Sequence, residues 1–364
     1  MFYNWFASNP KRFGKVRKGA LITIKDLART AGVSVTTVSR ALNGYNDVSE
    51  ETRRKIKRVA EELNYRPNVI ARSLVTKKSR TIGVILSEIN RAGAKDALAY
   101  ETLCGINDRT SELDYDILLF STNPKKQLSK SYADLCKERN VAGAIISGLR
   151  VHDQYLHEVT HDTNFPCVLI DIPSAGTNLG HVTTDNVQGA GIAVRHLLEL
   201  GHRNIAMING HNDAAVSRER LKGYHQELEK SGIAFRPEFV YNGNFSEEGG
   251  CEAMHQILLN QPEVTAVFSA SDLMVLGALR AVERSGGRVP ETISIVGFDD
   301  IAIASYCSPR LTTIRQDKYE MGYQSAQLLI DMLEGRNINR KIVLNTELIV
   351  RESVMPNIKP SRNS

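Results

Sequence analysis

Three short segments near the amino end carry apolar residues at the spacing of a helical face. The first predicted helix starts after Thr23, whose hydroxyl can cap it, and places Ile24, Leu27 and Ala31 on one side. Gly32 follows directly, and its backbone freedom suits the end of a helix. The spacing therefore predicts a short helix over residues 24–31.

A second helix is predicted directly after Ser34, which can cap it, with Val38 and Leu42 facing inward. Its outward face carries short side chains and one long cation, a combination that fits the major groove of DNA. The outward residues are Val35, Thr36, Thr37, Ser39 and Arg40. Two such helices joined by a tight turn form a helix-turn-helix motif.

The third segment completes a small core. Ser49 can cap its helix, and Glu50 and Glu51 lie in the first turn, where the helix dipole favours negative charge. The residues predicted to be buried are Ile56, Val59, Ala60 and Leu63. Three short helices therefore share one apolar centre.

From Thr81 the pattern changes to apolar runs that alternate with amphipathic helices. Such runs are typical of buried parallel strands, and their alternation with longer helices predicts βαβ units in doubly wound sheets. The predicted strands lie in residues 81–87, 115–121, 141–147, 166–172, 204–209, 238–242, 264–270 and 293–298. Ligands of such sheets bind beyond the carboxyl ends of the strands.

A linker over residues 67–78 separates these two patterns. Its segment PNVIARSL spans only about two helical turns, which is too short to remain helical alone in water. The segment is therefore either a plain linker or a helix that forms only with a partner.

Charge divides the chain at the same place. Residues 1–78 contain 17 Lys and Arg against 6 Asp and Glu, a net charge of +11, whereas residues 79–364 contain 29 against 35, a net charge of −6. A basic amino end by itself can be a solvated tail. Joined to a capped helix-turn-helix, it favours a surface that attracts phosphate groups.

Two segments of the basic region carry a specific signature. The sequence AGVSVTTVSRALN follows the pattern AGVSxxTVSRxLN, and NYRPNVIARSL follows NYxPNxxARxL. Further segments match in the same order, namely HVTTDNVQGAGIAVRHLLELGHRNIAMING, SASDLMVLGAL, ISIVGFDD, LTTIRQD, MGYQSAQLL and TELIVRESV. Residues 23–354 thus resemble the LacI/GalR family of bacterial transcriptional repressors.

The resemblance implies a small all-α helix-turn-helix head with a hinge helix, joined to an α/β two-lobed body like the type I periplasmic sugar-binding proteins. The implied divisions are an extension at 1–20, the head at 21–66, the hinge and linker at 67–78, the effector-binding and dimerisation body at 79–355 and a tail at 356–364. Within the body, the implied first lobe covers about 81–180 and 317–335, and the second about 181–309 and 344–354.

The head's functional residues are divided between bases and phosphates. Arg40 is long enough for a bidentate contact with guanine, and the resemblance implies that Val35 and Thr36 read bases that vary within the family. The remaining DNA-facing residues of the head are Thr23, Ser34, Thr37, Ser39, Asn43 and Thr52. For Ser34 and Thr37 the alternative role is helix capping, and one hydroxyl satisfies only part of both roles.

In the hinge, the resemblance implies paired helices from two subunits in the minor groove, with Leu74 wedged between base steps. Asn68 and Ala71 complete the expected hinge contacts to DNA.

For the body, the resemblance implies recognition of a small effector. Arg220 and the first aspartate of GFDD, Asp299, are the principal expected ligands, with Asp171 as another polar group and Phe245 as an aromatic face. Each has a structural alternative: a surface ion pair for Arg220, turn formation for Asp299, a cap for Asp171 and core packing for Phe245.

Two departures from the family pattern affect the choice of effector. The aromatic segment that commonly follows the first strand in sugar-binding members is replaced by Glu88–Lys95, and Ser271 stands where an asparagine is usual. Serine makes fewer hydrogen bonds than asparagine. With Arg91 and Lys95 nearby in sequence, a charged or larger effector is an alternative.

The segment His157–His161 fits the pattern HExxH of zinc hydrolases, in which two histidines bind the metal and the glutamate activates water. A third ligand is not evident, so a zinc metallohydrolase remains a remote alternative, and we expect no cofactor and no enzymatic activity. A sugar-binding transport protein would share the body but not the head.

Residues 1–20 match no part of the family pattern and lack the apolar core of a signal peptide. We expect them to be disordered, with translation starting near Leu21; a basic arm that contacts phosphate is the alternative. The five cysteines form no CxxC pair, which favours reduced thiols, and no apolar run approaches the ~20 residues of a membrane helix.

These features together predict a cytoplasmic, nucleoid-associated homodimer that reads a pseudo-palindromic operator, most simply as a repressor. A small molecule, with a sugar or sugar derivative favoured, binds between the lobes and alters DNA affinity by on the order of 1–3 kcal/mol. A nucleobase or phosphorylated metabolite acting as corepressor is the alternative. The carboxyl end lacks the leucine heptads of a tetramer, which favours a dimer.

Overall fold

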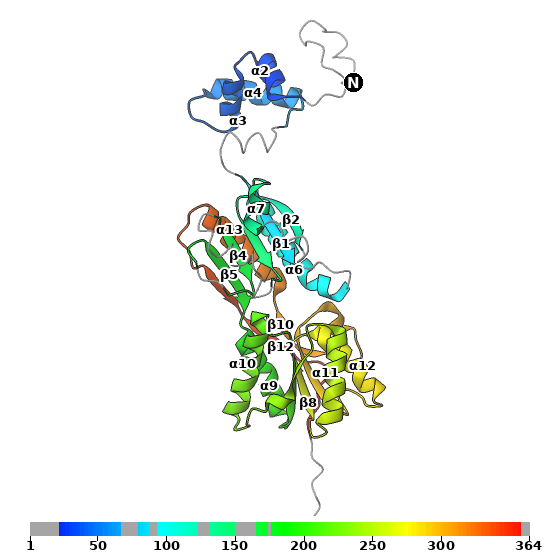
Figure 1. Ribbon diagram of the computed structural model, residues 1–364. Helices are drawn as coiled ribbons and strands as arrows, with labels where there is room; N and C mark the ends of the chain where they lie inside the picture. Colours follow the sequence, from blue (N-terminus) through cyan, green and yellow to red (C-terminus); the bar gives the residue numbers. More distant parts are fainter. Residues whose placement is uncertain are drawn as a thin grey trace, which may run out of the picture. The chain divides into compact units, whose positions relative to one another are not determined.

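The computed structural model describes residues 22–66, 79–87, 93–122, 131–149, 165–173 and 176–357, without the side chains of 87, 93–98, 121 and 122. The chain forms two compact units, a head within Met1–Lys78 and a body within Ser79–Ser364 (Figure 1). Several expectations lie outside the described residues: the extension, the hinge with Asn68, Ala71 and Leu74, the side chains of Arg91 and Lys95, and the His157–His161 segment.

The head consists of helices α2 (Ile24–Ala31), α3 (Val35–Leu42) and α4 (Glu50–Glu62), as the sequence predicted. Each begins at the predicted cap, because a hydroxyl of Thr23, Ser34 or Ser49 accepts a backbone N–H of the first turn. Gly32 ends α2 with a φ of 67°, a left-handed conformation that glycine adopts readily.

The head core is small and fully apolar. Leu27, Ala31, Val38 and Ile56 are completely buried where the three helices meet. Leu42 packs against this cluster but stays half-buried. Burial of these side chains holds together a unit too small to rely on helix propensity alone.

The described residues of the body form two six-stranded sheets. The first has the order β11-β5-β4-β3-β1-β2, and all its strands pair in parallel. Its strands are β1 (Thr81–Ser87), β2 (Asp116–Thr122), β3 (Ala144–Ser147), β4 (Cys167–Ile170), β5 (Leu179–Thr184) and β11 (Lys341–Leu344).

The second sheet has the order β12-β10-β9-β8-β6-β7. Its strands are β6 (Ile205–Asn209), β7 (Val240–Asn242), β8 (Ala266–Ser269), β9 (Ser294–Asp299), β10 (Thr312–Gln316) and β12 (Thr346–Ile349). All pair in parallel except β10 with β12, which is antiparallel.

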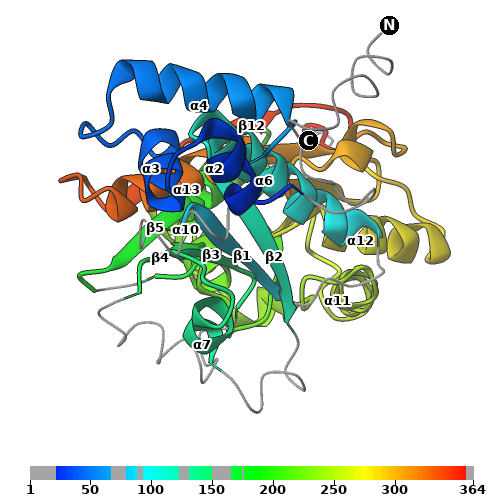
Figure 2. The ribbon, with the colours of Figure 1, turned by 90° about the horizontal axis from the view of Figure 1, so that it is seen from above.

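Helices cover both faces of each sheet. Beside the first sheet, α7 (Tyr132–Lys137) lies on one side, and α6 (Gly93–Glu112) and α13 (Lys318–Leu333) on the other (Figure 2). Beside the second, α9 (Asn186–Glu199) and α10 (Ala215–Lys230) face α11 (Glu247–Asn260) and α12 (Asp272–Arg284) across the strands (Figure 1). This is the doubly wound arrangement that the sequence predicted.

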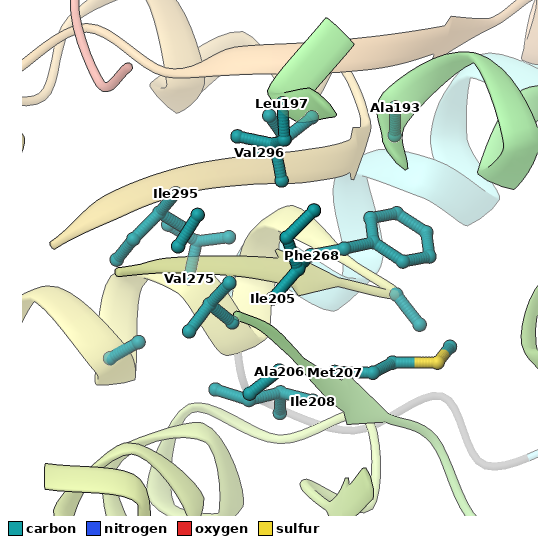
Figure 3. Packing of buried hydrophobic residues seen from close by; sticks show 14 of the residues in the cluster. Ala193, Leu197, Ile205, Ala206, Met207, Ile208, Phe268, Val275, Ile295 and Val296 are labelled. Atoms are coloured by element: carbon teal, nitrogen blue, oxygen red, sulfur yellow. The ribbon is translucent and has the colours of Figure 1, made fainter. Parts of the chain in front are cut away.

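The core of the second sheet explains why its strands are nearly continuous apolar runs. Side chains of neighbouring strands, among them Met207, Phe268 and Val296, are fully buried, and Leu197 of α9 packs on them (Figure 3). A strand covered on both faces has no solvent side that needs polar residues.

The lobe boundaries differ from the expectation. The second lobe was expected to begin near His181, but β5 runs to Thr184 within the first sheet and pairs with β4 and β11. The second sheet also extends beyond residue 309, because it includes β10. The reason is that the sheets are completed by pairing with strands distant in sequence, which no local pattern reveals.

One predicted strand, 238–242, is shorter in the structure. Residues 237–239 form a 3₁₀ turn, η2 (Pro237–Phe239), ahead of β7, because proline at its start has no N–H for a strand ladder. A second turn, η3 (Ala302–Ser305), follows β9.

The chain passes between the two sheets three times: from β5 to α9, from β10 to α13 and from β11 to β12. Among the described helices, none is both long and apolar enough to cross a membrane.

Candidate nucleic-acid interface and effector site

The exposed side of α3 presents the residues predicted to read bases. Val35 is 40% exposed, Thr36 is exposed, and the Arg40 side chain is 45% exposed. Val38 on the opposite side is fully buried. The fold therefore fixes which face of α3 is available to a groove.

Paired hydroxyls lie at the amino ends of α3 and α4. Ser34 Oγ accepts the Thr37 N–H at 3.0 Å and lies 2.8 Å from Thr37 Oγ1. Ser49 Oγ accepts the Thr52 N–H at 3.3 Å and donates to Thr52 Oγ1 at 2.9 Å. Ser34 thus acts as a cap, the alternative that the sequence left open.

Two other residues predicted to contact DNA also take part in local hydrogen bonds. Thr23 forms a reciprocal capping box with Asp26, whose carboxylate accepts the Thr23 N–H at 3.1 Å. Asn43 Nδ2 donates to Ser39 Oγ at 3.4 Å.

Arg40 has partners that the sequence did not predict. Its Nη2 lies 2.5 Å from Asp47 Oδ2, and its guanidinium lies 5.0 Å from the centre of the Tyr45 ring. Both partners belong to the loop between α3 and α4. Their proximity depends on the loop conformation, which the sequence pattern does not specify.

In the body, Arg220 is buried rather than part of a surface ion pair. It is 3% exposed and lies on α10, with its guanidinium 3.7 Å from the centre of the Phe298 ring. Its Nε donates to Asn186 Oδ1 at 2.9 Å and its Nη1 to the Ala270 carbonyl at 2.5 Å. The surface alternative for Arg220 is therefore wrong.

Asp299 lies opposite this arginine at the end of β9. Its Oδ1 is 3.7 Å from Arg220 Nη1 and accepts Gln316 Nε2 at 2.6 Å. Burial raises the pKa of Asp299, whereas the charges of Arg220 and Lys318 lower it. The carboxylate is thus held by donors inside the body.

The turn after β9 directs its two aspartates to different partners. Asp299 has a φ of 116° and Asp300 a φ of 49°, both unusual for residues other than glycine. Asp300 pairs with Arg315 Nε at 2.8 Å and Arg351 Nη2 at 2.7 Å. These ion pairs stabilise a turn that leaves Asp299 facing Arg220.

Asp171 brings the first sheet into the same network. It follows β4 with a φ of 59°, and its Oδ1 accepts Thr183 Oγ1 at 2.7 Å. Burial raises the pKa of Asp171, while Thr183 and the charge of Arg220 lower it. Asp171, Arg220 and Asp299 are therefore electrostatically linked across the two sheets.

Phe245 and Ser271 make their contacts at the ends of other strands. Phe245 meets His211 edge-to-face, with ring centres 5.6 Å apart, and a Cβ at Gly210 would lie 2.0 Å from its ring. Ser271 caps α12 by accepting the Met274 N–H at 3.3 Å. Like Asp171 and Asp299, both follow carboxyl ends of parallel strands, where α/β sheets bind ligands.

Sequence reasoning missed several polar residues of the network. Lys318 Nζ donates to the Asp299 carbonyl at 2.6 Å, and Asn186 Nδ2 donates to Glu219 Oε2 at 3.0 Å. Within the described body, Gln316 Oε1 is buried without a hydrogen-bond partner. A signal was present, because Gln316 and Lys318 lie at the carboxyl end of an apolar, β-branched run, where α/β sheets bind ligands.

Asp272 is a further buried carboxyl group beside Asp299. Burial, together with the nearby charge of Asp299, raises the pKa of Asp272 to about 8. Its oxygens accept Thr313 Oγ1 at 2.6 Å and the Ile301 N–H at 3.0 Å. This carboxyl is therefore predominantly protonated at neutral pH.

Comparisons with known proteins agree with both units. Residues 23–68 match the bacterial regulatory proteins of the lacI family, and residues 194–354 match a periplasmic binding protein-like domain. The transcriptional repressor CytR of Escherichia coli (strain K12) is 36% identical over 334 residues, which cover 91% of this chain and 96% of CytR.

Solved structures agree over the same length. A lac repressor dimer bound to operator and the anti-inducer ONPF is 32% identical, with a TM-score of 0.76, covering 92% of this chain and 100% of that one. The regulator CelR in complex with cellobiose is 32% identical, with a TM-score of 0.68, covering 91% and 99%. The chain belongs to the lacI family of DNA-binding transcriptional regulators.

Proposed function

We propose that this regulator is a homodimeric repressor whose affinity for a pseudo-palindromic operator is controlled by a neutral, hydroxyl-rich effector, a sugar or sugar derivative. The buried Arg220 network carries the proposal, because a desolvated arginine held between carboxylates of two sheets is costly for folding alone. A bound ligand that contacts both sheets would couple their relative position to the head.

The charges of this network favour a neutral effector. Among the described residues, the carboxylates of Asp171, Glu219 and Asp299 are accompanied by three cations, Arg220, Lys318 and Lys341, and Asp272 is protonated, so these charges already balance without an anionic ligand. A phosphorylated metabolite would bring further negative charge beside these acids. Sugar hydroxyls, in contrast, donate to carboxylates and accept from arginine. The binding of cellobiose by CelR is consistent with this class.

At the DNA, α3 of each subunit enters a major groove, with Arg40 on a guanine and Val35 and Thr36 on neighbouring bases. Ser34, Thr37, Ser39, Asn43, Thr52 and Thr23 set affinity through phosphates, and Asn68, Ala71 and Leu74 act from the hinge. Such a protein acts in the cytoplasm, where the chromosome lies.

The proposal is tested with the full chain and a duplex obtained by selection from a randomised DNA library. We expect glucose, ribose, cellobiose or a related neutral sugar to raise the unfolding temperature and to change the dissociation constant for DNA by about 5- to 150-fold. Ribose 5-phosphate and adenine serve as the competing classes. A response to the phosphorylated sugar alone would refute the charge argument, and DNA binding indifferent to every ligand would refute effector control.

A further inference from the structure

The loop between α3 and α4 holds the Arg40 guanidinium from two directions. Asp47 contacts its edge at Nη2, 2.5 Å away, and Tyr45 offers its ring face at 5.0 Å. Asp47 is 52% exposed in its side chain, so the pair lies at the surface of the head. The arrangement combines an ion pair with a cation–π contact on one side chain.

The loop is itself fixed to the head. Arg53 of α4 donates from Nη2 to the Tyr45 carbonyl at 3.0 Å, and from Nη1 to the Ala41 carbonyl at 3.4 Å. The Tyr45 N–H donates to the Arg40 carbonyl at 3.1 Å, and buried Val48 joins the head core. The positions of Asp47 and Tyr45 are therefore set by the folded head.

A guanidinium has five N–H donors in a plane, and the Asp47 contact engages only Nη2. Nη2 carries a second N–H, and this N–H together with the N–H beside it on a neighbouring nitrogen can still meet two acceptors of one base edge. Guanine presents such a pair, O6 and N7, in the major groove. An Arg40 guanidinium (the fork of N–H donors) whose orientation is already restricted loses less side-chain conformational entropy when it binds a base.

We propose that Asp47 is a specificity-determining positioning residue, which together with Tyr45 holds the Arg40 fork in the orientation that selects guanine. This inference rests on the proposed role of Arg40 as a base reader. The Asp47 carboxylate also repels phosphate, so it lowers affinity for unmatched DNA while it raises discrimination. Opposite effects on these two quantities distinguish it from a general surface charge.

The test uses the full chain and two duplexes at one salt concentration. The first is the sequence selected from a randomised library, and the second has the Arg40-dependent guanine replaced in both half-sites. The Arg40→Ala variant identifies that guanine. Discrimination is measured as the dissociation constant for the second duplex divided by that for the first. Asp47→Ala is expected to reduce this ratio about tenfold and to bind the second duplex more tightly than the wild type does. Asp47→Glu, which restores the charge, should recover part of the ratio.

Glu62→Ala is the matched control, since it removes the same charge from an exposed position of α4. It should tighten binding to both duplexes alike and leave their ratio unchanged. The proposal is overturned if Asp47→Ala behaves like Glu62→Ala, or if it increases the ratio, which would make Asp47 a competitor for Arg40. A library that yields no enriched sequence would overturn the proposed base reading as well.

Discussion

Arg40 in the head and Arg220 in the body have similar partners but differ in their exposure to solvent. Both carry a guanidinium over an aromatic ring and near a carboxylate, but the Arg40 side chain is 45% exposed and the Arg220 side chain 4%. Arg40 has donors available to an external partner. Arg220 is held by Asn186 and the Ala270 carbonyl as well as by Asp299.

The difference shows how one chain assigns base recognition and effector binding to arginines in different environments. In water, a charge pair contributes little to stability, so an exposed arginine can be used for recognition without affecting the fold. A buried arginine belongs to the fold itself, and a change at its site propagates through both sheets. We therefore expect substitutions in the body to affect stability and response, and those in the head to affect mainly DNA binding.

The strongest test of this contrast is Arg220→Ala. It removes the buried positive charge that Asp171 and Asp299 share, so we expect the free energy of unfolding of the body to fall by about 3–5 kcal/mol. The effector response of DNA binding should be lost. Denaturant unfolding and DNA titration with and without sugar measure the two effects.

A suitable control is Arg310→Ala, which removes an exposed arginine paired with Glu352 at 2.7 Å. The loss of unfolding free energy should be much smaller than for Arg220→Ala, as expected for a surface pair. An equal loss of unfolding free energy in Arg220→Ala and Arg310→Ala would show that burial does not distinguish the two arginines.

The second test is the pH dependence of the body. Because the folded state raises the pKa of Asp272 from 3.8 to about 8, folding favours its protonated form. The contribution of Asp272 to the free energy of unfolding is therefore greatest below pH 4. It declines as the pH rises toward 8, by up to about 1.4 kcal/mol per pH unit. Between pH 6 and pH 8 we expect a loss of about 2 kcal/mol.

The Asp272→Asn variant should flatten this decline, because an amide can still accept from Ile301 and donate to Thr313. Parallel unfolding curves for the variant and the wild type over that range would show that Asp272 is ionised in the folded body.

In the head, Arg40→Ala should weaken binding to the selected duplex by about 1–3 kcal/mol and relax preference at one base pair in each half-site. Because the side chain is exposed, the unfolding temperature should hardly change. Binding to a set of single-base variants measures the preference. A uniform loss across all sequences would reassign Arg40 to phosphate contact.

The smallest expected effect separates the two roles of Ser34. Ser34→Ala should destabilise the head by about 1 kcal/mol through loss of the cap, whereas Ser34→Gly should cost only a few tenths. If the hydroxyl also contacts phosphate, both variants should weaken binding to every duplex by a similar factor. Full affinity in Ser34→Gly would leave capping as its sole role.

The sequence predicted best where a residue and its partner are close along the chain. Thr23, Ser34 and Ser49 cap helices through bonds three residues away, so each cap could be read from its own segment. The family resemblance located Arg220 and Asp299, although the residues themselves left open a surface ion pair and a simple turn.

The missed features depend on contacts between distant segments. Asp272 accepts a hydrogen bond from Thr313, 41 residues away, and β11 pairs with β5 in a register that joins Ile342 to Val182. Asp47 shows a different difficulty: it is only seven residues from Arg40, but a loop with no repeating pattern determines their contact.

The triple passage of the chain between the sheets affects synthesis on the ribosome. The described helices of the head end at Glu62, whereas the first sheet is completed only by β11 and the second only by β12, which ends at Ile349. For most of its elongation, a nascent chain therefore contains the three head helices while both sheets of the body still lack strands. A premature stop codon before Thr346 would make that state permanent, because the product would keep the head helices but lack β12 of the body.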